Sequence, residues 1–196
     1  MVSLRPPTAS DLSQPDDFRP PSLDWLKGTW VVTHSTLPMW QSKRNVRITY
    51  TILPNNPKKD ATDNTSNQLD DLVEYQVLGS DKVKSIHGVD TAAGPKGGAW
   101  DWRGTGWLKI ASSHWEILGW GEGAGLKEQG TSEGEAQWAV TYFAKTLFTP
   151  AGIDIYSRKP SGLSETMIAE IKKGLEGFKD PNLEKLAGEL FEVKRD

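Results

Sequence analysis

Two short stretches constrain the fold of this chain most: LDWLKGTW at residues 23–30 and IDIYSRKP at residues 153–160. In the first, Gly28 frees the backbone between a helical turn and the strand-forming residues that follow it. The second contains a last strand that is followed by a proline. Only strand-like segments lie between the two stretches, and only helix-like segments come after them. This order predicts a sheet that closes into a barrel, with Arg158 stacked on the face of Trp30 to seal one end.

Alternation of apolar and polar side chains with a period of two predicts the strands between those ends. The alternation is clearest at 44–53, where Val46, Ile48, Tyr50 and Ile52 share one face. A polar loop is expected at 54–68, and a hairpin connection is expected from the glycine-rich stretch 119–125 to about residue 135. Further strands are expected at 29–35, 69–78, 83–89, 100–110, 114–120, 137–146 and 153–158. The pattern predicts an all-β fold with C-terminal helices, built on an antiparallel up-and-down barrel of about eight strands (8 to 10).

The two ends of the chain differ in character from the predicted barrel, which we assign to residues 22–160. Residues 1–21 hold five prolines among Ser, Asp and Thr. They predict an N-terminal arm that is either disordered or laid in extended form across the barrel. Residues 161–196 contain the candidate N-cap Ser164 and apolar residues at helical spacing. We expect helices that pack on the barrel, with a dimer contact as the alternative use of their apolar stripes.

The stretch Gly28-Thr29-Trp30, together with Tyr156-Ser157-Arg158-Lys159-Pro160 before a helix, resembles the lipocalins. The tail is most similar to the bacterial outer-membrane and apolipoprotein D branch of that family. The family's Thr-Asp-Tyr signature is replaced here by Thr141-Tyr142-Phe143, so the chain resembles a divergent, calycin-like member. The resemblance implies a lipocalin-like barrel that binds a small hydrophobic molecule, aromatic, polyene or lipid-like. It also implies that Met39 and Trp40 form part of a lid over the pocket mouth; the alternative is a surface loop.

Composition excludes several other classes of function. The 196 residues carry a net charge of −3, which gives no reason to expect nucleic acid or an anionic membrane surface as a partner. The chain has no cysteine, which excludes disulfides, thiol catalysis and thiolate metal sites. No segment reaches the roughly 20 apolar residues of a membrane span, and residues 1–21 hold no run of signal-peptide length. These features predict a cytoplasmic protein that is a monomer or a homodimer.

Tryptophan is concentrated in two neighbouring stretches, 100–110 and 114–120. The chain holds nine tryptophans, more than core filling usually requires, which favours a broad aromatic pocket inside the barrel. The alternative is a solid aromatic core. At Gly104 and Gly106 a bulge would reverse which side chains face inward.

Strand parity places polar side chains inside the same barrel, where they would orient a ligand. Arg44 would either meet a polar ligand group or reach water from the rim. The three histidines lie on different strands, and no dinucleotide or phosphate motif is present, so neither a metal nor a cofactor is expected. The predicted ligand-binding residues are His34, Met39, Trp40, Arg44, Tyr50, Tyr75, His87, Trp102, His114, Glu116, Trp120, Trp138 and Tyr142, with Trp30 and Arg158 as structural residues.

Two functions from different classes remain open on the sequence. The first is the binding of a small hydrophobic molecule in a Trp-rich lumen. The second is a cofactor-independent isomerase, cyclase or dehydratase, in which His34 or Glu116 moves a proton and Arg44 steadies developing charge. A solid barrel that serves as an interaction module is a third alternative. Single substitutions of these three residues would separate turnover from binding.

Overall fold

The computed structural model describes residues 2–54, 68–94, 96–123, 136–147 and 149–196. Most of the loop expected at 54–68, and most of the connection expected to continue to residue 135, lie outside these ranges.

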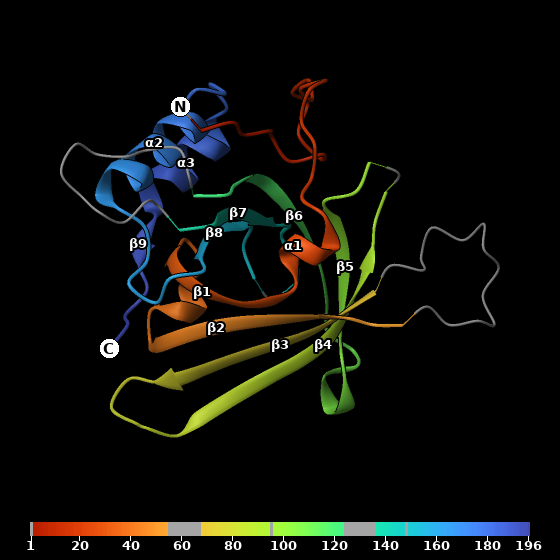
Figure 1. Cartoon of the computed structure of the whole chain (residues 1–196), viewed down its shortest axis with the longest axis vertical. Coiled ribbons are helices and arrows are strands. Elements are labelled where there is room, and N and C mark those ends of the chain that lie inside the picture. Colours follow the sequence, from red (N-terminus) through yellow and green to blue (C-terminus); the bar gives the residue numbers. More distant parts are fainter. Residues whose placement is uncertain (1, 55–67, 95, 124–135, 148) are drawn as a thin grey trace.

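In the described chain, eight strands close into an antiparallel barrel (Figure 1). Each strand pairs with its neighbour in sequence, and pairing of β1 with both β2 and β8 closes the barrel. A short additional strand, β9, pairs with the free end of β1. This architecture confirms the fold class predicted from the sequence. The strands are β1 (Gly28–Ser35), β2 (Lys43–Ile52), β3 (Gln68–Val77), β4 (Val83–Ala92), β5 (Ala99–Gly104), β6 (Ser112–Gly121), β7 (Trp138–Phe143), β8 (Gly152–Ser157) and β9 (Phe191–Glu192).

One end of the barrel lies next to α1 (Leu23–Leu26). It is closed by residues 28–30 and 156–160, the two stretches that resemble the lipocalins. Gly28 has a φ of +92°, a left-handed conformation that lets the chain turn sharply from α1 into β1. The guanidinium carbon of Arg158 lies 3.6 Å from the centroid of the Trp30 ring, so the predicted stack is present. Arg158 also donates hydrogen bonds to the carbonyls of Thr29 (2.9 Å) and Lys27 (2.7 Å). One side chain therefore ties the first strand to the last.

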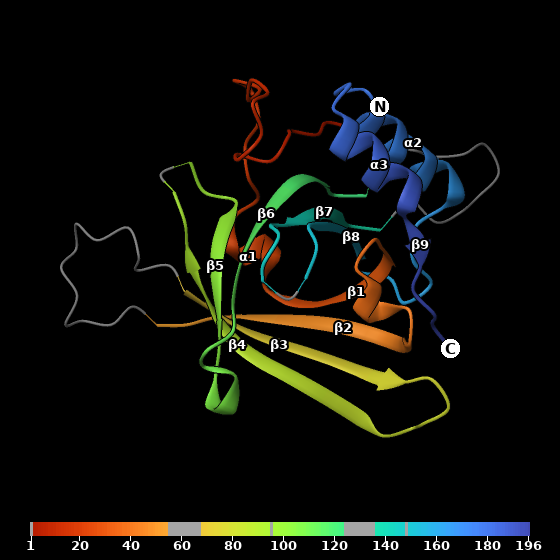
Figure 2. The ribbon, with the colours of Figure 1, turned by 180° about the vertical axis from the view of Figure 1, so that it is seen from behind.

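The opposite end, which we call the mouth, carries the connections β1–β2, β3–β4, β5–β6 and β7–β8, because consecutive strands of an up-and-down barrel alternate in direction. The first connection contains the single turn η1 (Pro38–Trp40), and the third contains η3 (Gly106–Leu108). The β3–β4 hairpin and η3 both lie at the lower edge of the molecule in Figures 1 and 2.

Two helices, α2 (Glu165–Glu176) and α3 (Pro181–Glu189), lie on one side of the barrel (Figures 1 and 2). The hydroxyl of Ser164 accepts a hydrogen bond from the N–H of Met167, as expected of an N-cap. The apolar stripe of α2, including Ile171 and Leu175, packs against the outer face of β8. Within the described residues, no helix has both the length and the apolar character to cross a membrane.

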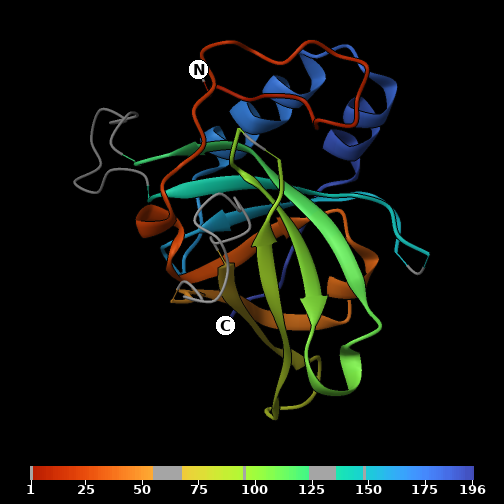
Figure 3. The same cartoon turned by 90° about the vertical axis from the view of Figure 1, so that its right-hand side faces the viewer.

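The N-terminal arm runs in extended form over the helices and β6 (Figure 3). Leu4 forms an isolated antiparallel bridge with Gly119, and a Cβ at Gly119 would lie only 2.2 Å from a methyl group of Leu4. The described part of the arm therefore contacts the barrel.

Three register shifts change which side chains face inward. They fall between Val32 and His34 in β1, between Arg44 and Arg47 in β2, and between Ile117 and Gly119 in β6. A bulge adds an unpaired residue, so the alternation beyond it continues on the opposite face. Strict parity carried across a bulge therefore assigns the wrong face on one side of it, as it does for His114 and Glu116 when they are placed on the same face as Trp120.

Candidate functional site

Aromatic rings form a continuous stack inside the barrel. The Trp115 ring stacks on Trp100 with centroids 4.4 Å apart, and on Tyr50 with centroids 5.5 Å apart. Phe143 extends the stack on the mouth side at 6.3 Å. These rings belong to the interior cluster, which is separate from the cluster beneath the helices. The Trp-rich stretches therefore supply a wall of planar apolar surface to the interior.

Two carboxyl groups are buried against this stack, Asp71 on β3 and Asp90 on β4. In the ladder Asp71 pairs with Gly88, and Asp90 pairs with Leu69, which puts the two carboxyls on diagonal positions of the inner wall. Trp115 donates an indole hydrogen bond to Oδ1 of Asp90 at 2.8 Å. The absence of a side chain at Gly88 is required here, because its Cβ would lie 2.2 Å from the Trp102 indole nitrogen.

Burial makes these carboxyls unusual acids. Burial raises the pKa of Asp90 to about 7, although the hydrogen bond from Trp115 acts in the opposite direction. Burial, reinforced by the charge of Asp90, raises the pKa of Asp71 well above its usual range. The interior therefore holds a carboxyl pair in which at least one proton is retained near neutral pH.

Several polar atoms on this wall have no hydrogen-bond partner. The side-chain atoms are Oδ1 of Asp71, Oδ2 of Asp90 and Nε1 of Trp100. Each unpartnered buried polar atom costs about 1–3 kcal/mol. Since native proteins satisfy most such groups, these three atoms on neighbouring strands favour contact with water or with a polar group of a ligand.

A second polar group lies nearer the mouth, around Asp154 of β8. Its carboxylate accepts a 2.5 Å hydrogen bond from the Ser35 hydroxyl and a 3.3 Å hydrogen bond from the indole N–H of Trp40. Burial raises the pKa of Asp154 to about 7. Trp40 packs edge-on against Tyr75 with centroids 6.1 Å apart. Trp40, from the first mouth connection, is therefore packed against the interior cluster.

The structure places some of the predicted ligand-binding residues inside the barrel. Tyr50 is buried in the stack, and Trp102 covers Gly88. Trp120 contacts Trp25 at the closed end, at 5.0 Å between centroids. The predicted residues that belong to the interior cluster or pack against it are Trp40, Tyr50, Tyr75, Trp102 and Trp120, while Met39 lies exposed beside Trp40.

The prediction that the remaining residues face the lumen is wrong. His34 follows the bulge in β1 and lies near Glu192 and Arg195 of the C-terminal segment, and burial lowers its pKa. Arg44 forms ion pairs with Asp81 and Asp196 at the rim. His87 is exposed and contacts Asp70 on the outer surface. Trp138 and Tyr142 pack in the cluster beneath the helices, because β7 is buried on both faces. The residues that face away from the lumen are His34, His87, His114, Glu116, Trp138 and Tyr142, whereas Arg44 lies at the rim, which is the alternative that the sequence left open.

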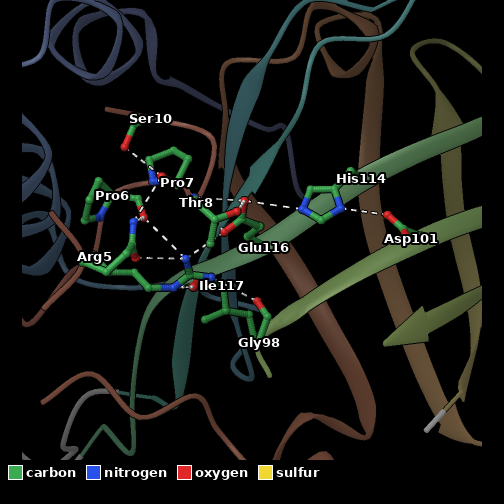
Figure 4. Close-up of polar contacts among 11 residues, drawn as sticks. Arg5, Pro6, Pro7, Thr8, Ser10, Gly98, Asp101, His114, Glu116 and Ile117 are labelled. Atoms are coloured by element: carbon green, nitrogen blue, oxygen red, sulfur yellow. Dashed lines mark hydrogen bonds and ion pairs between the residues drawn. The ribbon is translucent and has the colours of Figure 1, made fainter. Parts of the chain in front are cut away.

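His114 and Glu116 instead belong to a cluster that holds the arm (Figure 4). Arg5 donates a 2.7 Å charged hydrogen bond to Glu116, and Thr8 donates from its backbone N–H (3.1 Å) and its hydroxyl (2.7 Å). Burial acts to raise the pKa of Glu116, but hydrogen bonds from His114, Thr8 and Arg5 lower it to about 2. The hydrogen bond to Glu116 raises the pKa of His114 to about 8. This arrangement fixes the arm rather than a ligand in the lumen.

Sequence reasoning missed the interior residues Asp71, Asp90, Asp154 and Tyr156. The signal for the first was present in the strand at 69–78, where Asp71 has the same parity as the inward Leu69 and Val73. Acidic residues are almost never buried without a partner, so parity alone does not predict an inward-facing Asp71.

A hollow of about 210 Å³ lies outside the barrel, between β2 and the C-terminal residues. Its lining includes Asn45, Arg47, Gln76 and Asp196. Its volume is below the range of roughly 300–1,000 Å³ typical of small-molecule pockets, and it contains no carboxyl of the interior wall.

No family model matches this chain. The protein named Botcinic acid biosynthesis cluster B protein 12, from Botryotinia fuckeliana (strain B05.10), is 28% identical to it in an alignment that covers 96% of this chain and 82% of that protein.

Solved structures share the fold at low sequence identity. Major allergen Per a 4 from cockroaches superposes with a TM-score of 0.56 at 10% identity, covering 94% of each chain. Apocrustacyanin C1 has a TM-score of 0.54 at 12% identity over 87% of this chain and 77% of its own. The siderocalin Ex-FABP has a TM-score of 0.50 at 12% identity over 87% of this chain and 94% of its own. The chain therefore has the lipocalin-like fold, a closed eight-stranded antiparallel barrel with an added strand and two C-terminal helices.

Proposed function

We propose that this protein binds a small hydrophobic molecule with at least one polar substituent inside the barrel. The observation that carries the proposal is the set of unpartnered polar atoms beside the stacked rings Tyr50, Trp115 and Trp100. The rings match a flat aromatic, polyene or lipid-like body, and the polar atoms match a hydroxyl, carbonyl or amine on it.

Such a ligand reaches the interior through the mouth. The interior side chains pack against one another in the structure, so the Trp40 lid and the rings behind it must separate. The lid is held by one long hydrogen bond to Asp154, at 3.3 Å, and by ring contacts with Tyr75. We place the activity in the cytoplasm, since a chain without cysteine has no need of an oxidising compartment.

The lipocalin-like comparisons support this proposal at the level of fold. The siderocalin Ex-FABP functions through dual ligand specificities. A barrel of this architecture, with an aromatic interior that holds a few polar groups, is suited to binding a small molecule.

The test uses two planar probes that differ by one polar group, 1-aminoanthracene and anthracene, titrated against tryptophan fluorescence. The wild-type protein should bind the amine roughly tenfold more tightly, because its N–H groups meet unpartnered acceptors. Asp71→Leu removes an acceptor from the inner wall and should abolish this preference while it retains affinity for anthracene.

Asp70→Leu is the matched control, because Asp70 is the preceding residue on the same strand and contacts His87 on the outer surface. This variant should keep the preference for the amine. Failure of the wild-type protein to bind either probe, or loss of the preference in both variants alike, would contradict the proposal.

A second candidate is a cofactor-independent isomerase, cyclase or dehydratase that acts on such a molecule in the same interior. The observation that favours it is the carboxyl pair of Asp71 and Asp90, in which the pKa of Asp90 is about 7. A retained proton on one carboxyl supplies a general acid, and an ionised neighbour supplies a general base. These groups replace His34, Arg44 and Glu116, which do not face the interior. The name of the Botryotinia relative, which refers to a biosynthesis cluster, is consistent with a role in making a metabolite.

The two functions separate in the organism that produces the protein. Asp71→Asn and Asp90→Asn preserve shape and polarity but remove the proton-transfer groups. If the protein is an enzyme, a strain with either variant should accumulate the same metabolites as a deletion strain. A wild-type metabolite profile in both variant strains would exclude acid–base catalysis by this pair and leave binding as the function.

A further inference from the structure

Large apolar side chains are exposed mainly at one end of the barrel. Among the described residues, six large hydrophobic side chains are exposed, and Ile110 and Leu147 are the extremes at 93% and 95%. Five of the six belong to the mouth connections or to the strand residue next to them. The five are Met39, Leu78, Val83, Ile110 and Leu147, while the sixth, Ile52, lies at the closed end.

The same connections carry a local positive charge that the whole-chain charge of −3 conceals. We call residues 36–44, 78–84, 103–111 and 144–147 the mouth rim. Its acidic residue is Asp81, which is paired with Arg44 at 2.6 Å, and Asp196 of the C-terminal segment forms a second ion pair with Arg44. The basic residues of the mouth rim are Lys43, Arg44, Lys82, Lys84, Arg103, Lys109 and Lys145.

Positions of individual lysines reinforce this charge. Lys43 lies over the rings of Trp40 and Tyr75, at 5.7 and 5.1 Å from their centroids. Burial, together with the charge of Lys84 on the neighbouring hairpin, lowers the pKa of Lys43. An anionic surface beside these residues would offset the repulsion between the charges of Lys43 and Lys84.

We propose that the mouth rim docks on an anionic lipid surface, with Ile110 and Leu147 inserted among the lipids and the surrounding lysines on the headgroups. Apolar side chains bordered by basic residues are the chemistry of peripheral membrane binding, since the first enter the interface and the second meet anionic headgroups. In this orientation the mouth and Trp40 would face the lipid. A hydrophobic molecule bound as proposed above could then pass directly between the lipid and the barrel interior.

The proposal is tested by sedimentation of the purified full chain with vesicles of phosphatidylcholine, alone or with about 30 mol % phosphatidylserine. The wild-type protein should partition at least about tenfold more strongly to the anionic vesicles, and added salt should reduce that binding. Ile110→Ser with Leu147→Ser, and separately Lys109→Glu with Lys145→Glu, should abolish it. These side chains are exposed, so circular dichroism and thermal unfolding of the variants should match the wild type.

Matched controls lie elsewhere on the molecule. Ile52→Ser removes an exposed apolar side chain at the closed end, and Lys173→Glu with Lys185→Glu makes the same charge change on the helices. Both should sediment like the wild type. So should Asp71→Leu, which separates this proposal from the proposed ligand site. The proposal is overturned if the wild type stays in solution with both kinds of vesicle; an acidic protein surface would then be the partner that fits the mouth rim. It is also overturned if the control variants lose vesicle binding as the rim variants do.

Discussion

At the residue scale, the interior carboxyls decide how the chain responds to pH. Asp90 and Asp154 are buried, and burial raises the pKa of each to about 7. The folded state therefore holds protons between about pH 4 and pH 7 that the unfolded chain has released. The free energy of unfolding must then fall as the pH rises through that interval. Glu116 affects the free energy of unfolding in the opposite direction, because its pKa in the folded state, about 2, lies below its ordinary value of 4.5. Its contribution to stability is present above about pH 4.5 and is lost only as the pH falls below that value.

Asp90→Asn should flatten this dependence. Between pH 5 and pH 8 the decrease in the free energy of unfolding should be smaller by about 2 kcal/mol than in the wild type, because the variant side chain does not ionise. Urea unfolding at several pH values measures this. Asp17→Asn, which changes an exposed residue of the arm, should reproduce the wild-type slope. An Asp90→Asn slope equal to the wild type would show that Asp90 does not carry the retained proton.

At the element scale, the strands could be located from the sequence but the faces of several strands could not. The clear alternation at 44–53 and the turn residues predicted all eight barrel strands, but the strand expected at 100–110 ends at Gly104, because the chain enters the turn η3 at Gly106. A bulge after Val32 turned His34 outward, and no local residue type marks that position. In β7 the larger apolar residues face the helices and the smaller Ala139 faces the interior, so alternation alone assigned the wrong face. A strand buried on both faces loses the polar side that identifies its orientation.

The arm is held on the barrel by several contacts, of which the ion pair between Arg5 and Glu116 is the charged one. Arg5→Met should release residues 2–21, because Glu116 is buried and would lose its charged partner. Breaking such a pair costs about 3–5 kcal/mol, which release of the arm into solvent would partly relieve. Hydrogen exchange of the arm and urea unfolding measure the two effects.

Two further variants, Gly119→Ala and Arg19→Met, are compared with Arg5→Met. Gly119→Ala should also displace the arm, since its methyl group would overlap Leu4. Arg19→Met should have no effect, because the Arg19 guanidinium is bonded only to nearby carbonyls of Asp16 and Phe18 in the described chain. Slow exchange of the arm in Arg5→Met would show that the ion pair does not hold it.

At the scale of the whole molecule, the fold could be predicted because each of its two diagnostic stretches is short and continuous in sequence, and the two meet where Arg158 stacks on the Trp30 ring. Gly28, Trp30 and Arg158 meet at the closed end in the predicted arrangement. The interior chemistry could not be predicted, because Asp71 and Asp90 become partners only through the ladder between β3 and β4 and through burial by Trp115. The charge of the mouth rim was hidden in the same way, by acidic residues elsewhere on the chain.

The central claim is that the barrel interior accepts a small hydrophobic molecule, and native mass spectrometry tests it most directly. The protein, purified from the organism that produces it and then incubated with 1-aminoanthracene, is compared with its denatured mass. We predict one bound small molecule per chain, either retained through purification or taken up from solution, that dissociates on denaturation and can be identified after organic extraction. A bare polypeptide mass under both conditions would contradict the claim and show that the aromatic interior is a closed core.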